Sequence, residues 1–219
     1  MEQIKKVKNP AWIIIFWTFL ISLAYAVIRY HIVGPVPWKD LSFYVLNKGN
    51  ALSAFILLSI NFSLGPLRKL GLAIPDNWLK SRKILGIMGF LQVFVHLIMS
   101  FILLRPTVYA KFFEADGTLT LFAGLNLIGG ITAFIFIWIY NISFNMELRK
   151  DKELIRFITS RKVTIYAIFM AGVHLFFMGY EGWLEPGGWH GGLPPISLIA
   201  FIIFLFGFVI NLLGRADSE

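Results

Sequence analysis

Long apolar runs separated by short basic or polar segments dominate this chain of 219 residues. A helix needs about 20 mainly apolar residues to cross the hydrocarbon core of a bilayer. Six runs come close to that length and predict membrane-spanning helices, at about residues 11–30, 50–67, 84–104, 119–140, 163–180 and 196–213. We therefore expect an all-α integral membrane protein, a six-helix bundle that forms one transmembrane domain over residues 1–219.

The first run resembles a secretion signal, because Lys5 to Lys8 precede it and Ala24-Tyr25-Ala26 imitate a cleavage site. However, its charge-free part covers residues 9–28, which is longer than the apolar core of a typical signal peptide. We expect this segment to remain as the first helix.

Basic residues predict how the bundle is oriented. Fifteen of the 20 Lys and Arg residues fall at the N-terminus, in the second and fourth loops or in the tail, and the other five lie on the opposite side. Because loops rich in Lys and Arg stay in the cytoplasm, both termini are predicted to be cytoplasmic. These charges also meet membrane lipid, so the net charge of +8 does not indicate binding to nucleic acid.

Composition supports the membrane assignment and excludes some chemistry. Hydrophobic residues make up 58% of the chain and charged residues only 15%, whereas a soluble domain has nearer half and a quarter. Cysteine is absent, which excludes disulfides, iron–sulfur clusters, thiolate zinc sites and a cysteine nucleophile.

Two of the four histidines fall inside predicted spans, where ionisable residues are costly and usually functional. His96 lies 13 residues after Lys83, and His174 lies 12 residues after Lys162. At about 1.5 Å per residue, both stand roughly 18–20 Å from the cytoplasmic edge. Their helices run in the same direction, so the two imidazoles are expected at one level. His31 and His190 are expected at the interface and in a Gly-rich outer loop.

Two imidazoles at one depth suit a haem, whose iron takes axial donors on opposite faces of the porphyrin. Zinc fits less well, because two histidines alone leave its coordination incomplete. Interhelical hydrogen bonding is the other reading of an intramembrane histidine. The alternative function is therefore a haem-free scaffold or small-solute transporter in which His96 and His174 are packing or proton-relay groups.

Three marker segments in the second and third helices resemble the ferric reductase-like transmembrane family, most closely its bacterial MsrQ (YedZ) branch. They are a Gly-Asn-Ala-Leu start, a Pro-Leu-Arg-Lys end, and a basic loop leading to a helix with His-Leu, at residues 49–52, 66–69 and 81–97. The resemblance is good over residues 49–104 and thinner over 160–180. MsrQ-like proteins keep a further histidine near the start of the fifth helix, and this chain has none there.

The resemblance implies a haem b protein with His96 and His174 as axial ligands of the iron. A second haem would need histidines 13 residues nearer the cytoplasm, where this chain has Lys83 and Arg161, so one haem per chain is expected. The implied function is electron transfer from a cytoplasmic flavin or quinol donor to an acceptor on the outer side of a bacterial inner membrane. The chain would then be an oxidoreductase component, working with a flavoprotein reductase or quinol and with a periplasmic redox partner.

A basic cluster is expected at the cytoplasmic mouth of the helices that carry the histidines. It consists of Arg82, Lys83, Arg161 and Lys162. Such a cluster suits haem propionates, the phosphate of a flavin such as FMN, or a quinone head group. The plainer interpretation is that these cations only set the topology.

Overall fold

The computed structural model describes residues 9–145, 147 and 150–214, and its secondary structure over this part is helical apart from one isolated bridge between Phe113 and Leu119. Six of its helical segments are long and apolar enough to cross a membrane. They are Ala11–Ile32, Trp38–Lys69, Asp76–Leu103, Leu121–Ile142, Lys152–Trp183 and His190–Leu213. The chain is thus an all-α, multi-pass membrane protein.

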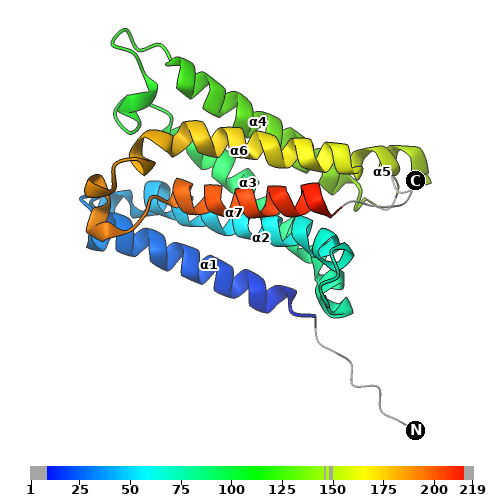
Figure 1. Ribbon diagram of the computed structural model, residues 1–219. Helices are drawn as coiled ribbons and strands as arrows, with labels where there is room; N and C mark the ends of the chain where they lie inside the picture. Colours follow the sequence, from blue (N-terminus) through cyan, green and yellow to red (C-terminus); the bar gives the residue numbers. More distant parts are fainter. Residues whose placement is uncertain (1–8, 146, 148–149, 215–219) are drawn as a thin grey trace.

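The main helices within these segments are α1 (Ala11–Val27), α2 (Leu46–Lys69), α3 (Asp76–Leu103), α4 (Leu121–Ile142), α6 (Arg161–Trp183) and α7 (Ile196–Leu213). A short helix, α5 (Lys152–Ile158), precedes α6, and π-helical turns over Ile28–Ile32 and Leu41–Val45 end α1 and lead into α2. The start of α1 and the end of α7 lie at the same end of the bundle (Figure 1). We call this the proximal end and the opposite one the distal end.

Several helices begin before the apolar runs that predicted them. Helix α3 starts at Asp76, eight residues before the expected position 84, and Arg68 pairs with Asp76 at 2.7 Å. Lys80, Arg82 and Lys83 therefore lie on a helix and not in a loop. Helix α6 begins where the Ser160 hydroxyl accepts a hydrogen bond from the Val163 amide.

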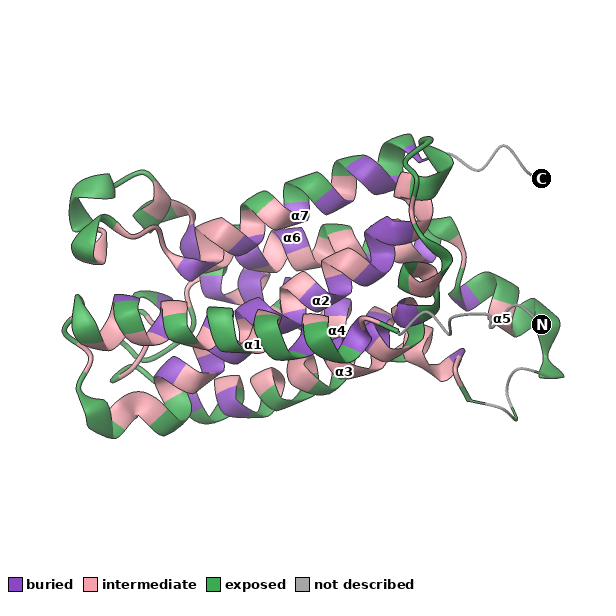
Figure 2. Ribbon diagram, turned by 90° about the horizontal axis from the view of Figure 1, so that it is seen from below, coloured by how far each residue is buried: buried purple, intermediate pink, exposed green. Residues whose placement is uncertain are grey.

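The outward faces of the helices are exposed (Figure 2), and they present many large apolar side chains, whereas several polar side chains are buried together with the apolar core. On α1, Trp12 is 62% exposed and Phe16 59% exposed. Asn47, Asn61 and Asn126 are almost fully buried. A large exposed apolar face is unfavourable in water but matches a hydrocarbon environment, in which helices associate through close packing and polar contacts.

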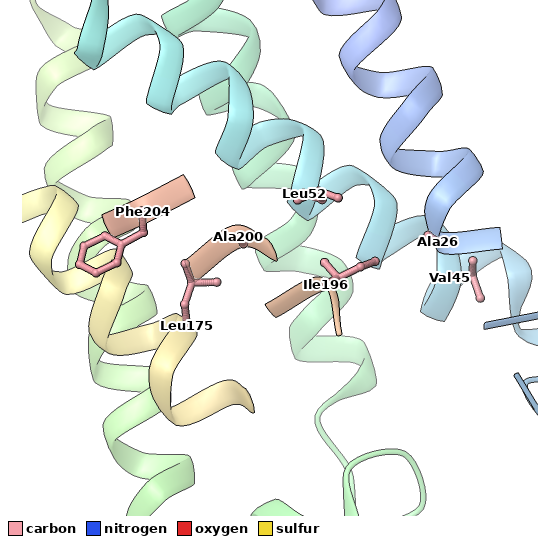
Figure 3. Close-up of a cluster of buried hydrophobic side chains, with 7 residues drawn as sticks. All are labelled: Ala26, Val45, Leu52, Leu175, Ile196, Ala200 and Phe204. Atoms are coloured by element: carbon pink, nitrogen blue, oxygen red, sulfur yellow. The ribbon is translucent and has the colours of Figure 1, made fainter. Parts of the chain in front are cut away.

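The bundle consists of two groups of three consecutive spans. Helix α2 packs most extensively on α3 and α1, and α6 packs on α4 and α7. Contact between α2 and α7 joins the groups, whereas α3 and α4 touch only slightly. Figure 3 shows the buried apolar side chains around this junction, among them Leu52 of α2, Leu175 of α6 and Phe204 of α7. On the side of α3 and α4, where contact is slight, space remains between the two groups of helices.

Candidate functional site

A cavity of about 490 Å³ occupies that space and is lined by α2, α3, α4, α6 and α7. Its volume is within the range of small-molecule and cofactor sites. The lining extends from Lys48 and Tyr109 at the distal end to Ser63 and Asn211 nearer the proximal end, and most of it is apolar. His96 and His174 both line this cavity, one from each group of helices.

His96 is oriented by an amide of the neighbouring helix. Its Nδ1 lies 2.7 Å from Oδ1 of Asn47, and the Asn47 amide nitrogen donates to the Ser100 hydroxyl at 3.1 Å. Because an amide oxygen only accepts hydrogen bonds, Nδ1 of His96 carries the proton in this contact. The neutral ring therefore has its free lone pair on Nε2, the nitrogen available to a metal.

His174 has the same arrangement on the opposite wall. Its Nδ1 lies 3.1 Å from the backbone oxygen of Asn126, which can only accept. The Asn126 side-chain amide in turn donates to the His174 backbone oxygen at 2.7 Å. His174 is thereby held at its backbone and at Nδ1 by one residue of α4, and its Nε2 also keeps a free lone pair.

A glycine on α4 makes room for the His174 ring. A Cβ added at Gly130 would lie 2.7 Å from Nδ1 of His174, and one added at Gly129 would lie 2.7 Å from the His174 backbone nitrogen. Both distances are well below an ordinary contact, so a side chain at either position would displace α6 or the ring.

The structure brings the two predicted ligand side chains together. Their ring centroids are 6.3 Å apart, with the planes at 75°. Two metal–nitrogen bonds of about 2.0–2.1 Å on opposite sides of one metal, together with the radius of each ring, separate two imidazole centroids by roughly 6 Å. Among the described residues, no hydrogen bond reaches either Nε2. The spacing and the free nitrogens fit a pair of axial ligands.

The small residues near the histidines serve different purposes. Ala167, about two turns before His174 on α6, lines the cavity. Gly89 instead packs against α2, where an added Cβ would lie 2.9 Å from the Leu58 side chain. Gly172 accommodates the ring of Phe204.

The expected basic cluster lies at the proximal end, but none of its four members lines the cavity. Nε of Arg82 donates to the Asn61 backbone oxygen at 3.0 Å, and Arg161 donates to the backbone oxygens of Asn211 and Leu212. Both arginines thus bind backbone carbonyls of a neighbouring helix, Arg82 on α2 and Arg161 on α7. Lys83 and Lys162 are exposed.

Two other lysines do line the cavity, and sequence reasoning missed them. Lys48 and Lys111 face its distal end together with Tyr30, Tyr44 and Tyr109. The sequence placed Lys48 outside the second span, which was expected to start at residue 50, whereas α2 starts at Leu46. Because of this earlier start, Lys48 belongs to the helix and lines the cavity.

The remaining histidines lie outside the cavity lining. Nδ1 of His31 is 2.7 Å from the Val36 backbone oxygen, and its ring stacks on Trp38 at 4.3 Å between centroids. His190 packs edge-on against Tyr30. Both are at the distal end, His31 in the π-helical turn that ends α1 and His190 in the connection before α7, and they serve as internal controls for the central pair.

No protein-family model matches the chain, and no curated protein matches it either.

Proposed function

We propose that this chain is a haem b protein that transfers electrons across a membrane, with His96 and His174 as the axial ligands. The observation that supports this most directly is the pair of cavity-lining imidazoles, 6.3 Å apart. In each ring Nδ1 is engaged by an acceptor on a neighbouring helix and Nε2 is left for the iron. The cavity is large, mainly apolar and built on rigid helices, as a porphyrin site requires.

The donor set favours a haem over a metal ion held by protein groups alone. Among the described residues, no group of three or more His, Asp or Glu side chains could hold a metal ion. A porphyrin supplies four equatorial nitrogens itself, so that two imidazoles complete the coordination. When bound, the haem supplies reversible one-electron chemistry at an iron whose two axial positions are already filled.

The protein's own residues determine how such a group behaves. Asn47 and Asn126 fix the tautomer and orientation of the ligating rings, and such hydrogen bonds raise the basicity of an imidazole ligand. The apolar lining excludes water and lowers the local dielectric, which influences a redox potential. Leu52, Leu175 and Phe204 belong to this lining and also to the buried core.

The proposed direction of transfer is from the proximal to the distal side, with both termini in the cytoplasm of a bacterial cell. The excess of Lys and Arg at the proximal end supports this orientation, as does the resemblance to ferric reductase-like and MsrQ-like proteins. Five of those cations, Lys5, Lys6, Lys8, Arg149 and Arg215, lie outside the described residues. A soluble flavoprotein or a quinol would donate electrons, and an oxidised periplasmic partner would accept them.

One bound haem per chain is the expected result for the purified protein. A pyridine haemochrome assay measures the ratio of haem to chain, and the reduced-minus-oxidised spectrum should have the bands of an iron with two histidine ligands. A ratio of two would indicate further ligands beyond the histidine pair. Purified protein that neither contains haem nor binds it when added would favour the haem-free scaffold or transporter.

Electrons must cross the proximal half of the bundle to reach the histidines. Helices α3 and α6 are continuous from Lys83 to His96 and from Lys162 to His174, so the imidazoles lie about 18–20 Å from those lysines along the helix axes. We propose that FMN or a quinone binds at Arg82, Lys83, Arg161 and Lys162 and shortens this gap. The cavity supports a path, because Asn211 lines it and its backbone oxygen binds Arg161.

Charge reversal at the two lysines of the cluster tests the proposed donor site without breaking the arginine contacts. The variant Lys83→Glu/Lys162→Glu should slow haem reduction by the reduced flavin or quinol donor about tenfold, the effect of losing a hydrogen bond to a charged group. Stopped-flow absorbance measures this rate, and dithionite should still reduce the haem fully. Lys152→Glu on α5 is the matched control. Equal rates in both variants would mean that the cluster only sets topology.

A further inference from the structure

Two lysines share the distal end of the cavity, and neither forms an ion pair with any described residue. The Lys48 ammonium lies 5.4 Å from the ring centroid of Tyr44 and 5.0 Å from that of Tyr109. Nζ of Lys111 donates to the Met178 backbone oxygen at 2.5 Å. The ion pairs of the described residues are Arg68–Asp76 and Lys150–Glu147, and neither involves these lysines.

The surroundings of these lysines favour an anion. Burial lowers the pKa of Lys111, and the positive charge of Lys48 lowers it further, while Glu181 opposes the shift. Cations inside a membrane protein are costly and usually pair with an opposite charge or a ligand. Contacts with aromatic rings offset part of this cost, but among the described residues neither lysine forms an ion pair.

Each lysine is tied to a segment next to one of the histidines. Lys48 directly follows Asn47, whose side chain holds His96. Lys111 is bound to Met178, which lies four residues after His174 on α6. Because one turn of helix rises about 5.4 Å, Lys111 lies on the distal side of His174. The Lys48 ammonium reaches the same side, where it contacts Tyr109 of the connection between α3 and α4. Both lysines are therefore within the reach of one ligand that also spans the histidine pair.

We propose that Lys48 and Lys111 bind the two propionate carboxylates of the haem, so that its charged edge faces the distal end of the cavity. This inference rests on the proposed function, because it assumes a porphyrin between His96 and His174. Two carboxylates on one edge of an otherwise apolar molecule match two ammonium groups at one end of an otherwise apolar cavity. Charge-assisted hydrogen bonds of this kind are short and strong.

The opposite orientation is less well supported by the contacts. Propionates that pointed to the proximal end would need Arg82 and Arg161, and both arginines already donate to backbone oxygens and lie outside the cavity lining. The proximal part of the lining contains Ala133, Ile137 and Ala167. This apolar wall suits the vinyl and methyl edge of the porphyrin.

Comparing haem with its dimethyl ester tests the proposal, because esterification removes both carboxylate charges and leaves the iron and the ring unchanged. The full-length protein, purified in detergent without haem, is titrated with each compound while Soret absorbance is recorded. Wild-type protein should bind haem about 10–100-fold more tightly than the ester, as expected for hydrogen bonds to charged groups. Lys48→Met/Lys111→Met should bind haem and ester equally, with an unchanged affinity for the ester.

Lys39→Met is the matched control, since Lys39 is an exposed distal lysine outside the cavity lining; it should keep the preference for haem. Lys48→Arg/Lys111→Arg should keep most of the preference as well.

An equal loss of affinity for both compounds in the Met variant would assign the lysines a structural role and overturn the inference. Equal binding of both compounds by wild-type protein would overturn this inference but leave the proposed function standing. Wild-type protein that binds neither would overturn both.

Discussion

Replacing His96 or His174 by alanine is expected to abolish the two-histidine haem spectrum. Each variant removes one of the two Nε2 donors that face the cavity, and the described part of the lining contains no third histidine to replace it. The remaining imidazole alone cannot hold a six-coordinate iron. Absorbance of the purified variants should show a loss of the low-spin Soret and α bands, with the ratio of haem to chain falling close to zero.

The distal histidines provide the controls for this experiment. His31→Ala and His190→Ala should retain the wild-type spectrum and haem content, because both rings lie outside the cavity lining. Membrane insertion and thermal unfolding of all four variants would separate loss of ligand from loss of fold. If the alanine variants of both central histidines kept a full complement of haem with unaltered bands, the proposed ligand pair would be wrong.

Substituting Gly130 by alanine is expected to weaken haem binding about 10–100-fold, the effect typical of disturbing the groups that orient a metal ligand. The new methyl group would approach Nδ1 of His174 to 2.7 Å and Cε1 to 3.2 Å. The imidazole would have to turn away from the backbone oxygen of Asn126, which fixes its tautomer. Titration of the haem-free variant, followed by Soret absorbance, measures the change in affinity.

Gly124→Ala is the matched control on the same helix. A Cβ at Gly124 meets nothing within 4 Å, and replacing glycine by alanine inside a helix stabilises it by about 0.5–1 kcal/mol. This variant should bind haem as the wild-type protein does. Equal affinities in Gly124→Ala and Gly130→Ala would mean that the His174 ring is not held against α4 in the functional protein.

The predicted spans and the observed helices agree in their central parts and differ at their ends. Apolar runs reflect the thickness of the hydrocarbon core, but a helix continues through the interface while caps and polar side chains satisfy its last backbone groups. Residues 46–49 of α2 and 76–83 of α3 lie in such extensions. Asn47 and Lys48 were overlooked for this reason.

The predicted histidine pair and the predicted basic cluster depended on different kinds of information. The level of His96 and His174 follows from regular helix rise, counted from a charged residue, and the structure brings both rings into one cavity. Arg82 and Arg161 also lie at similar levels on their helices. The direction in which each arginine side chain points, however, depends on which backbone carbonyls of other helices lie near it. Those carbonyls belong to α2 and α7, and their approach cannot be read from α3 or α6 alone.

The sequence by itself determined that six segments are long and apolar enough to cross a membrane, and it predicted two histidines at one level, because hydropathy and helix rise are local properties of a chain. Only the tertiary structure decided which nitrogen of each ring is free, through Asn47 and the Asn126 backbone. It also decided that Gly130 makes room for a ring and that Lys48 faces the cavity. These features depend on contacts between residues far apart in sequence, and such contacts exist only once the helices have packed.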